Sequence, residues 1–376
     1  MGRRRVTRKN KGGLSRRSFL KGAGAASALL ATQPFLGAGA QDDDVSSSAA
    51  AGSSPFHHGV ASGDPRSERV MLWTRVTLAA PPDSIPVTYV VATDTALANI
   101  VTSGTASADA AHDYTVKVDV AGLSPGTTYY YRFSANGMDS QIGRTRTLPV
   151  GSVDRLRIAV LSCASLAHGY FNAYRCVAHR ADLDLVVHLG DYIYEYGDGD
   201  YGSARNYQPP HEIITLHDYR TRHNQYKRDP DVKALHRQHP VVAIWDDHEF
   251  ADNAWLGGAA NHQPDTEGAW TDRVNAAVQA YYEWMPIRPP ASGDIRNIYR
   301  SFRIGDLAEL FMLEERITAR DQQLDSNLPG GTSLFTESGA YLDTSRHMIS
   351  NTQQNWLLNH MHQSTAQWKL IGQGVV

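Results

Sequence analysis

Three short runs of almost unbroken apolar residues most constrain what this chain can fold into. Each run is rich in Val, Leu and Ile, and the three span residues 156–161, 183–189 and 241–245. Strands this apolar are typical of a parallel sheet that is covered on both faces. The segments between them carry helical spacing or helix-start signals, such as Asp229 before Pro230. The pattern therefore predicts an α/β (α+β) fold over residues 155–376, with helices flanking a sheet.

Polar side chains follow each of the three runs, where the strands are expected to end. They are Ser162 and Cys163, then Gly190 and Asp191, and then Asp246, Asp247, His248 and Glu249. Because ligand sites in such sheets lie beyond the carboxyl ends of the strands, these residues are expected to meet at one edge. Carboxylates suit hard cations, whereas imidazole and thiolate suit transition metals, so the mixture predicts a site with more than one ion.

Each of these residues also has a purely structural interpretation, and the sequence leaves that interpretation open. Asp191 can cap a strand or a turn. Cys163 can be a buried strand thiol, and Tyr194 can be a packed aromatic ring. His248 can be a hydrogen-bonded histidine of the core.

Residues 55–148 have a different rhythm, with short strands separated by turns. The expected strands lie at 70–76, 87–92, 114–118 and 129–133. The stretch 123–133 resembles the Leu-x-Pro-x-Thr-x-Tyr corner of fibronectin type III modules, and Tyr129, Tyr131 and Phe133 alternate onto one face, which we expect to be core. The segment is predicted to be an all-β, immunoglobulin/fibronectin III-like domain that precedes the α/β region.

Residues 1–40 have the features of an export signal. Basic residues lead to Ser15-Arg16-Arg17-Ser18-Phe19-Leu20-Lys21, and an apolar stretch follows at 23–36. That stretch is shorter than the about 18 to 20 apolar residues needed to cross a bilayer, and Ala38-Gly39-Ala40 offers a small-residue cleavage site. We predict a twin-arginine signal peptide over 1–40 and a flexible linker over 41–54. The alternative is a basic arm that binds nucleic acid or membrane surfaces.

Removing this segment changes the charge of the chain. Nine of the 36 Lys and Arg residues lie in 1–40, which has no Asp or Glu, so 27 basic residues remain against 39 acidic ones, a net charge of −12. A chain this acidic has little general attraction for polyanions, so no nucleic-acid-binding module is expected. The mature form is expected to lack a transmembrane anchor. Its two cysteines, Cys163 and Cys176, are too few for a disulfide scaffold.

Several longer motifs resemble a single family. They are Gly190-Asp191-Tyr192-Ile193-Tyr194-Glu195-Tyr196, residues 212–220, Trp245-Asp246-Asp247-His248-Glu249 and, nearer the N-terminus, residues 59–65 and 72–75. Together they resemble alkaline phosphatase D, the PhoD-like phosphodiesterases and phosphomonoesterases, from about Phe56 to the end of the chain. The resemblance implies a metallophosphoesterase-type β-sandwich with flanking helices over 155–376.

The resemblance also implies roles for particular residues. Cys163, Asp191 and Tyr194 would bind Fe³⁺, Asp191 would bridge to Ca²⁺, and Asp247 would contribute to the calcium side. Thiolate and phenolate are strong donors that favour a ferric ion over Mg²⁺. His248 would contact phosphate and assist the leaving group as the catalytic residue.

One motif departs from the family pattern. Arg316 stands where the family has an arginine after Leu-Asp-Thr, but this chain reads Leu313-Glu314-Glu315-Arg316. A substrate-binding role for Arg316 therefore competes with a surface ion pair. A further set of residues has no motif to support a role and is interpreted as packing or surface: His168, Cys176, His211, His217 and His223.

The expected function is that of a secreted alkaline phosphatase or phosphodiesterase. Paired ions about 3.5 to 4 Å apart generate hydroxide near neutral pH and neutralise the charge on the transferred phosphoryl group. The expected partners are a phosphate-ester substrate and the twin-arginine translocase, and the expected location is the periplasm, the cell surface or the medium. No Gly-Asp-x-His motif follows the expected strand at 368–372, so the chain is expected to be truncated and to lack the remaining metal ligands.

Two rival functions stay open at this point. A surface adhesin or binding module is supported by the expected β-sandwich and by the incomplete ligand set. An iron redox protein that uses Cys163 and Tyr194 has no cofactor motif to support it.

Overall fold

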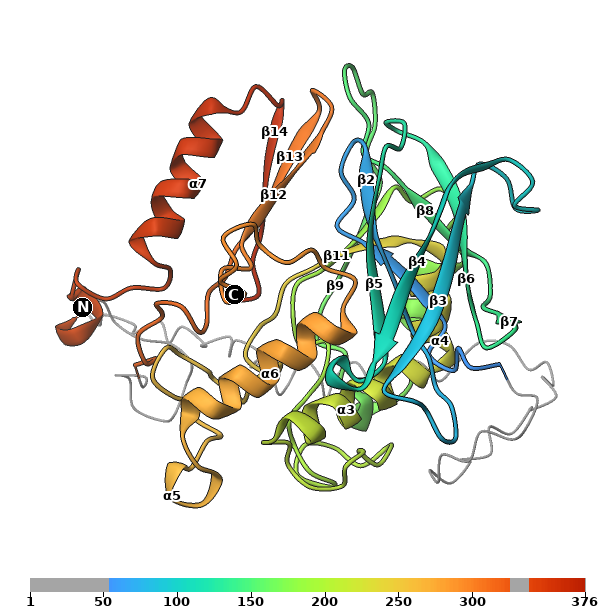
Figure 1. Cartoon of the computed structure of the whole chain (residues 1–376). Coiled ribbons are helices and arrows are strands. Elements are labelled where there is room, and N and C mark those ends of the chain that lie inside the picture. Colours follow the sequence, from blue (N-terminus) through green and yellow to red (C-terminus); the bar gives the residue numbers. More distant parts are fainter. Residues whose placement is uncertain (1–53, 325–337, 376) are drawn as a thin grey trace, which may run out of the picture. The chain divides into compact units, whose positions relative to one another are not determined.

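A six-stranded sheet lies at the centre of the computed structural model (Figure 1), with the order β5-β2-β1-β11-β10-β9. The apolar runs form its parallel strands β9 (Ile158–Leu161), β10 (Leu185–His188) and β11 (Pro240–Ala243), which confirms the predicted α/β sheet. β10 and β11 are buried. β9 is the last strand of this sheet in the described part of the chain, and its Val160 is 62% exposed. The expectation that all three strands are covered on both faces is therefore wrong for β9.

The structure describes residues 54–324 and 338–375, all of which belong to one compact unit. The predicted signal peptide and all but the last residue of the predicted linker lie outside the described residues. Within them, no helix is both long enough and apolar enough to cross a bilayer.

Strands from the N-terminal region complete the central sheet. They are β1 (Val60–Gly63), β2 (Arg69–Arg75) and β5 (Thr115–Ala121). β1 pairs in parallel with β11, with Ser62 opposite Pro240, and antiparallel with β2, which pairs with β5. A Cβ at Gly63 would lie 2.3 Å from the Pro286 carbonyl oxygen, so this junction requires glycine. One sheet thus runs through both regions, which the local sequence patterns did not indicate.

The other N-terminal strands form a second sheet of order β4-β3-β6-β7, in which β8 also pairs with β6. Its strands are β3 (Ser84–Ala92), β4 (Ile100–Asp109), β6 (Thr128–Ala135), β7 (Met138–Asp139) and β8 (Gly143–Arg146), and η1 (Ala110–His112) follows β4. Tyr129, Tyr131 and Phe133 are buried, which confirms the predicted core face. The Tyr129 hydroxyl accepts a hydrogen bond from the Ser124 N–H at 2.8 Å. β4 was not predicted because it has no apolar alternation.

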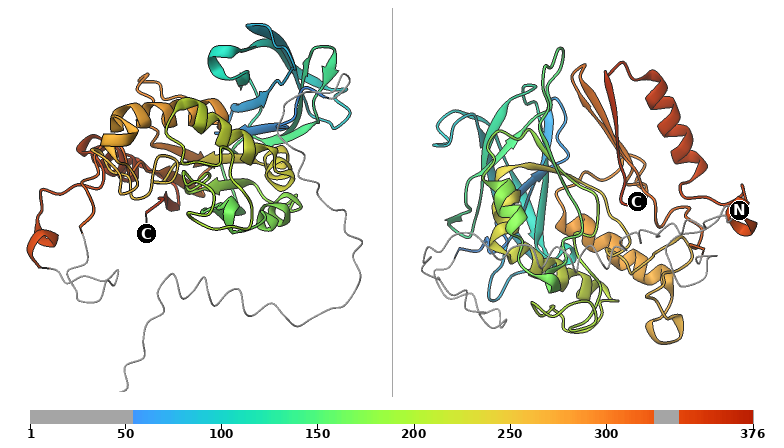
Figure 2. Two further views of the ribbon diagram at one scale, coloured as in Figure 1. Left: turned by 90° about the horizontal axis from the view of Figure 1, so that it is seen from below. Right: turned by 180° about the vertical axis from the view of Figure 1, so that it is seen from behind.

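A third sheet lies beside the central one and consists of β12 (Arg300–Ile304), β13 (Ala308–Met312) and β14 (Trp368–Gly372). β14 is the strand expected at 368–372, and it runs parallel to β13. Helix α7 (Asn351–Gln363) follows η3 (Gly339–Leu342) and contacts β13 through the Trp356 and Phe311 rings, 6.0 Å apart. Figure 2 shows the same elements from below and from behind.

Helices lie between the parallel strands, as predicted: η2 (Leu166–His168) and α2 (Asn172–Ala178) follow β9, and α3 (Leu216–Arg228) and α4 (Pro230–Gln238) follow β10. After β11 come α5 (Pro264–Glu267) and α6 (Trp270–Trp284), which lead to the third sheet. The Asp229 side chain accepts hydrogen bonds from the N–H groups of Asp231 and Val232, which confirms the predicted start of α4. α2 packs on α4 and α3 packs on α6. Buried residues of α2, α3, α4 and α6 belong to the same hydrophobic core as those of β10 and β11.

Candidate metal centre

The loops after β9 and β10 lock together at the carboxyl edge of the sheet. The N–H of Cys163 donates to the Gly190 carbonyl at 3.2 Å, and that of Ala164 donates to the Asp191 carbonyl at 2.8 Å. Cys163 and Asp191 both have left-handed backbones, with φ of 58° and 55°, a costly conformation for residues other than glycine. The interlocked turns fix Cys163 and Asp191 at the edge that the sequence pattern predicted.

A buried carboxylate joins the loop after β10 to the loop after β11. Glu249 accepts hydrogen bonds from the backbone N–H groups of Asp191 at 3.0 Å, Tyr192 at 2.5 Å and Asp246 at 2.7 Å. The two loops approach so closely that a Cβ at Gly190 would lie 2.4 Å from the Cβ of Asp246. Burial, and then the charge of Asp191, raises the pKa of Glu249 to about 8.

Asp191, Asp247 and His248 converge in one buried cluster. One possible ligand atom from each lies within 4.8 Å of the others. Oδ2 of Asp191 accepts a hydrogen bond from the Tyr194 hydroxyl at 3.1 Å. Oδ1 of Asp191 is buried and has no hydrogen-bond partner in the described part of the chain. An oxygen in that position suits a bound cation, because a buried carboxylate is costly without a partner. The two converging carboxylates therefore offer oxygen donors that fit a metal ion, with the imidazole of His248 beside them.

The acidic groups of this cluster repel one another when no cation is bound. Burial and the charges of Asp247 and Asp246 raise the pKa of Asp191 to about 7, against the opposing effect of His248. Burial and the Asp191 charge also raise the pKa of the Cys163 thiol. Metal ligands must be deprotonated, so we expect metal binding to release protons from these groups.

His248 is oriented by a second buried carboxylate. Its Nδ1 lies 2.7 Å from Oε2 of Glu195, whose Oε1 accepts hydrogen bonds from the Asp252 N–H at 2.7 Å and the Asn261 side chain at 3.0 Å. Burial acts to lower the pKa of His248, but the hydrogen bond and charge of Glu195 outweigh it and raise that pKa to about 10. A carboxylate on Nδ1 leaves Nε2 to face a ligand.

Arg316 lies at the cluster and not at the surface. Its side chain is buried, with Nε 2.5 Å from Oδ1 of Asp246 and Nη2 3.4 Å from Oδ1 of Asp247. The alternative of a surface ion pair is therefore wrong. Glu314, at a position where the chain departs from the family pattern, accepts hydrogen bonds from the N–H groups of Arg316 and Ile317, both at 2.8 Å. This carboxylate shapes the turn that presents the guanidinium to the two aspartates.

The residues that the sequence left without a role do not join the cluster. Cys176 is exposed, His211 lies 3.4 Å from Asp218, and His223 is buried against the Trp284 ring. His217 is exposed, and His168 lies edge-on to Tyr201. One carboxylate that organises the centre, Glu195, was not expected there, although it lies within a run that carries the family resemblance. Asp246 and Glu249 were expected at this edge of the sheet, but no role was predicted for either.

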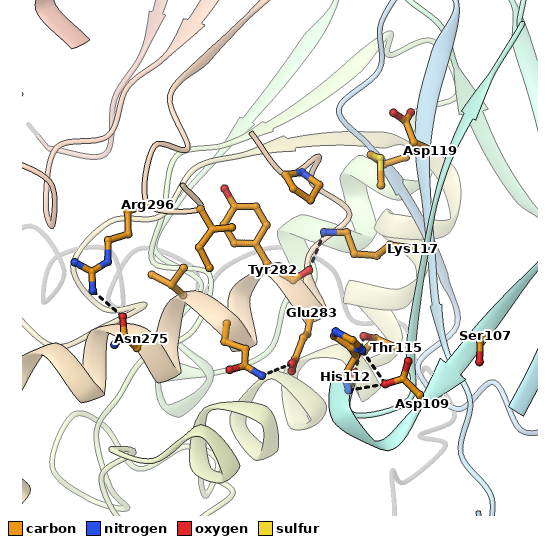
Figure 3. A pocket seen from close by; sticks show the side chains of 15 residues that line it. Ser107, Asp109, His112, Thr115, Lys117, Asp119, Asn275, Tyr282, Glu283 and Arg296 are labelled. Atoms are coloured by element: carbon orange, nitrogen blue, oxygen red, sulfur yellow. Dashed lines mark hydrogen bonds and ion pairs between the residues drawn. The ribbon is translucent and has the colours of Figure 1, made fainter. Parts of the chain in front are cut away.

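A separate pocket of about 770 Å³ lies between β5 and α6 and includes none of the cluster residues (Figure 3). Its polar side chains are largely paired with one another or with backbone. The Lys117 ammonium donates to the Tyr282 carbonyl at 2.8 Å, and Arg296 donates to the Asn275 side chain at 2.6 Å. Gln279 likewise donates to Glu283 at 2.9 Å. The buried Asp191 oxygen without a hydrogen-bond partner within the described residues lies in the cluster, so the cluster is the stronger candidate for a functional site.

Comparisons with known proteins agree with this geometry. Family models for the PhoD-like phosphatase and for its N-terminal domain match residues 158–376 and 41–149. Alkaline phosphatase D of Bacillus subtilis (strain 168) is 38% identical over 380 residues, which cover 96% of this chain and 62% of that protein. A solved structure described as PhoD is 39% identical, with a TM-score of 0.77 over 85% of this chain and 62% of its own. The chain thus spans about three-fifths of these relatives, and it belongs to the PhoD-like phosphatase family.

Proposed function

We propose that this chain hydrolyses phosphate esters at the centre formed by Asp191, Asp247 and His248. The observation that carries the proposal is their convergence around a buried Asp191 oxygen that lacks a hydrogen-bond partner among the described residues. Family membership supports the proposal, since the curated relative is named an alkaline phosphatase. Because the chain covers 62% of that relative, the activity of the whole protein is itself part of the proposal.

The proposed metal ligands are those that the family resemblance implies. Cys163, Asp191 and Tyr194 would hold Fe³⁺, and Asp191 and Asp247 would hold Ca²⁺. The Tyr194 hydroxyl lies 3.1 Å from Asp191, so both groups are within reach of one ion. Bound ions would supply positive charge against the phosphoryl group and a nucleophilic hydroxide at neutral pH. Two ions have more coordination positions than these four residues fill, so we propose that further groups complete the centre.

His248 and Arg316 would act on the substrate. His248 would donate a proton from Nε2 to the leaving-group oxygen, while Glu195 holds the ring through Nδ1 at 2.7 Å. The Arg316 guanidinium is fixed by Asp246 and Asp247, and its remaining N–H groups would bind a phosphate oxygen. Positive charge on this face would favour the phosphorylated ligand in a chain of acidic net charge.

The remaining assignments concern location and domain organisation. We propose that residues 1–40 direct export through the twin-arginine translocase and that 41–54 form a linker. Residues 55–148 would be an immunoglobulin/fibronectin III-like domain. Residues 155–376 would be a metallophosphoesterase-type β-sandwich, to which they contribute β9, β10 and β11 of the central sheet and the whole third sheet. The destination would be the periplasm, the cell surface or the medium. Export in the folded state suits a protein whose metal centre is filled before release.

An Asp191→Asn variant tests the function. It removes one negative charge from the cluster, so bound iron and calcium and the turnover of bis-p-nitrophenyl phosphate should all fall at least about 100-fold. The matched control is Asp265→Asn, an exposed aspartate on α5, which should retain metal and turnover. Wild-type metal content is measured by elemental analysis. Turnover by Asp191→Asn equal to that of the control would sink the proposal, and a wild-type chain without metal or turnover would support the rival binding module.

A further inference from the structure

Aromatic side chains stack along one side of His248. Tyr194 lies 4.3 Å from the His248 ring, centroid to centroid, and stacks on Tyr201 at 5.4 Å with the planes 16° apart. Tyr196 stacks on Tyr201 at 4.8 Å and 22°, and His168 meets Tyr201 edge-on at 4.8 Å. We call Tyr194, Tyr196, Tyr201 and His168 the aromatic wall. It extends from the proposed proton donor toward the surface.

Among the three tyrosines of the wall, Tyr201 is the most exposed to solvent. Tyr194 is buried and Tyr196 is partly buried, whereas Tyr201 is 36% exposed. The Tyr201 ring centroid lies 5.9 Å from that of His248. Contacts with three other rings hold Tyr201 in place although it belongs to no helix or strand. A ring fixed before a ligand arrives loses little conformational entropy on binding, so Tyr201 is a preorganised contact surface.

The chemistry around the wall limits what it can bind. Carboxylates lie beside the wall: Asp191 accepts a hydrogen bond from the Tyr194 hydroxyl at 3.1 Å, and Glu195 lies 2.7 Å from Nδ1 of His248. The wall itself contains no Lys or Arg, and Arg205 instead lies over the Tyr170 ring at 5.2 Å. A second anionic group is therefore disfavoured here. Near-parallel rings present a stacking surface, and they do not surround a ligand as the rings of a cation cage do.

We propose that Tyr201 is a specificity-determining residue that stacks on an uncharged planar ring in the leaving group of the phosphate ester. The chemical class is an aryl or nucleoside ester whose ring lies on the His248 side of the phosphorus. The inference rests on the proposed function, because the proton donor His248 marks the side from which the leaving group departs. Stacking of a base or aryl ring on a tyrosine would favour such esters about fivefold over non-planar ones of equal size.

Binding of two phosphonates by the purified chain tests this inference without turnover. Phenylphosphonate and cyclohexylphosphonate have the same number of carbon atoms and, in a buffer alkaline enough to make both dianions, the same phosphoryl charge, but only phenyl is planar. Calorimetric titration should give about fivefold tighter binding of phenylphosphonate by the wild type. Tyr201→Leu should bring the ratio close to one, and Tyr201→Phe should retain it. Tyr170→Leu, at a tyrosine that is 70% exposed and outside the wall, is the matched control and should also retain the ratio.

The outcomes separate the two proposals. Equal binding of both phosphonates by the wild type would overturn the stacking role and leave the phosphate site intact. A preference that survives Tyr201→Leu, in a variant whose circular dichroism and Tm match the wild type, would also overturn it. If neither phosphonate binds the wild-type chain, the phosphate centre itself fails, and the inference fails with it.

Discussion

Two regions next to the Asp191 loop each bury a long basic side chain, Arg316 in one and Lys227 in the other, and the surroundings of these two side chains differ. The turn after β13 buries Arg316, which has Asp246 at 2.5 Å and Asp247 at 3.4 Å. Helix α3 buries Lys227, which is 2% exposed. Its Nζ lies 3.0 Å from Nε2 of His236 and 5.1 Å from the ring centroids of Trp73 and Tyr192. In the described part of the chain, no carboxylate forms an ion pair with Lys227.

The difference decides which side chain keeps its charge. Burial acts to lower the pKa of Arg316, but the charges of Asp247 and Asp246 outweigh it and raise that pKa. Burial lowers the pKa of Lys227 well below its usual value, and no charged partner opposes the shift. The carboxylates beside Arg316 therefore favour its charged form, whereas burial of Lys227 favours the neutral amine. Arg316 belongs to the candidate metal centre, whereas Lys227 packs against His236, Trp73 and Tyr192.

The largest change in stability is expected when the guanidinium paired with Asp246 and Asp247 is removed. Arg316→Leu leaves Asp246 and Asp247 buried without their partner, and loss of one member of a buried ion pair costs about 3–5 kcal/mol. Urea unfolding of the metal-free chain at pH 9 should show this loss. Arg180→Leu is the matched control, because the ion pair of Arg180 with Asp182 is 58% exposed at the arginine and its loss should change stability little. Equal costs for the two variants would mean that Arg316 does not support the aspartates.

The next largest effect is expected from the carboxylate that ties the two loops. Glu249→Gln replaces one acceptor oxygen by an N–H group facing backbone donors. At pH 5 the folded Glu249 is protonated, because its pKa is raised to about 8, and the cost of the raised pKa is small because that pH lies close to the unfolded value of about 4.3. Because a buried donor left without its acceptor costs about 1–3 kcal/mol, the free energy of unfolding at pH 5 should fall by a similar amount. Glu309→Gln, on the partly exposed face of β13, is the control and should change little. An unchanged stability for Glu249→Gln would show that the loops after β10 and β11 do not need Glu249 to stay together.

The sequence predicted the elements that depend on local pattern. The parallel strands β9, β10 and β11, the start of α4 at Asp229 and the edge position of Asp191 and Asp247 all follow from apolar runs and the residues that end them. The pairing of β1 with β11 was not predictable in this way. Ser62 and Pro240 are partners although the chain between them is long, and no local pattern encodes such a register.

The same limit applies to the side chains that organise the site. Glu195 and His248 are 53 residues apart in the chain, and their hydrogen bond arises only when the loops after β10 and β11 meet. Arg316 was assigned a surface alternative because its motif departs from the family pattern. The structure shows that Glu314 supplies the turn that brings it inside. A lysine within a helix gives no local sign that it is buried, so the environment of Lys227 could come only from the tertiary structure.

Substitution of Lys227 should have the opposite effect on stability from substitution of Arg316. In unfolded chains Lys227 has a pKa of about 10.4, and the folded pKa is lowered, so the unfolded state binds the proton more tightly. Above about pH 10.4 the amine is neutral in both states, so its ionisation does not affect the free energy of unfolding. As the pH falls from there toward the folded pKa, protonation of the unfolded state lowers that free energy by up to about 1.4 kcal/mol per pH unit. Methionine cannot titrate, so Lys227→Met should remove this dependence and stabilise the chain by about 1 kcal/mol at pH 9, net of the lost His236 contact.

Urea unfolding from pH 7 to pH 10 measures this prediction as a difference between variant and wild type, in which the titration of other groups cancels. The gain from Lys227→Met should grow as the pH falls. Lys369→Met, at an exposed lysine on β14, should give a difference that does not vary with pH. A destabilisation by Lys227→Met of the size expected for Arg316→Leu would mean that Lys227 is charged in the folded chain. Arg316 and Lys227 would then both be charged, and the distinction between a charged side chain at the candidate metal centre and a neutral one in the packing would not hold.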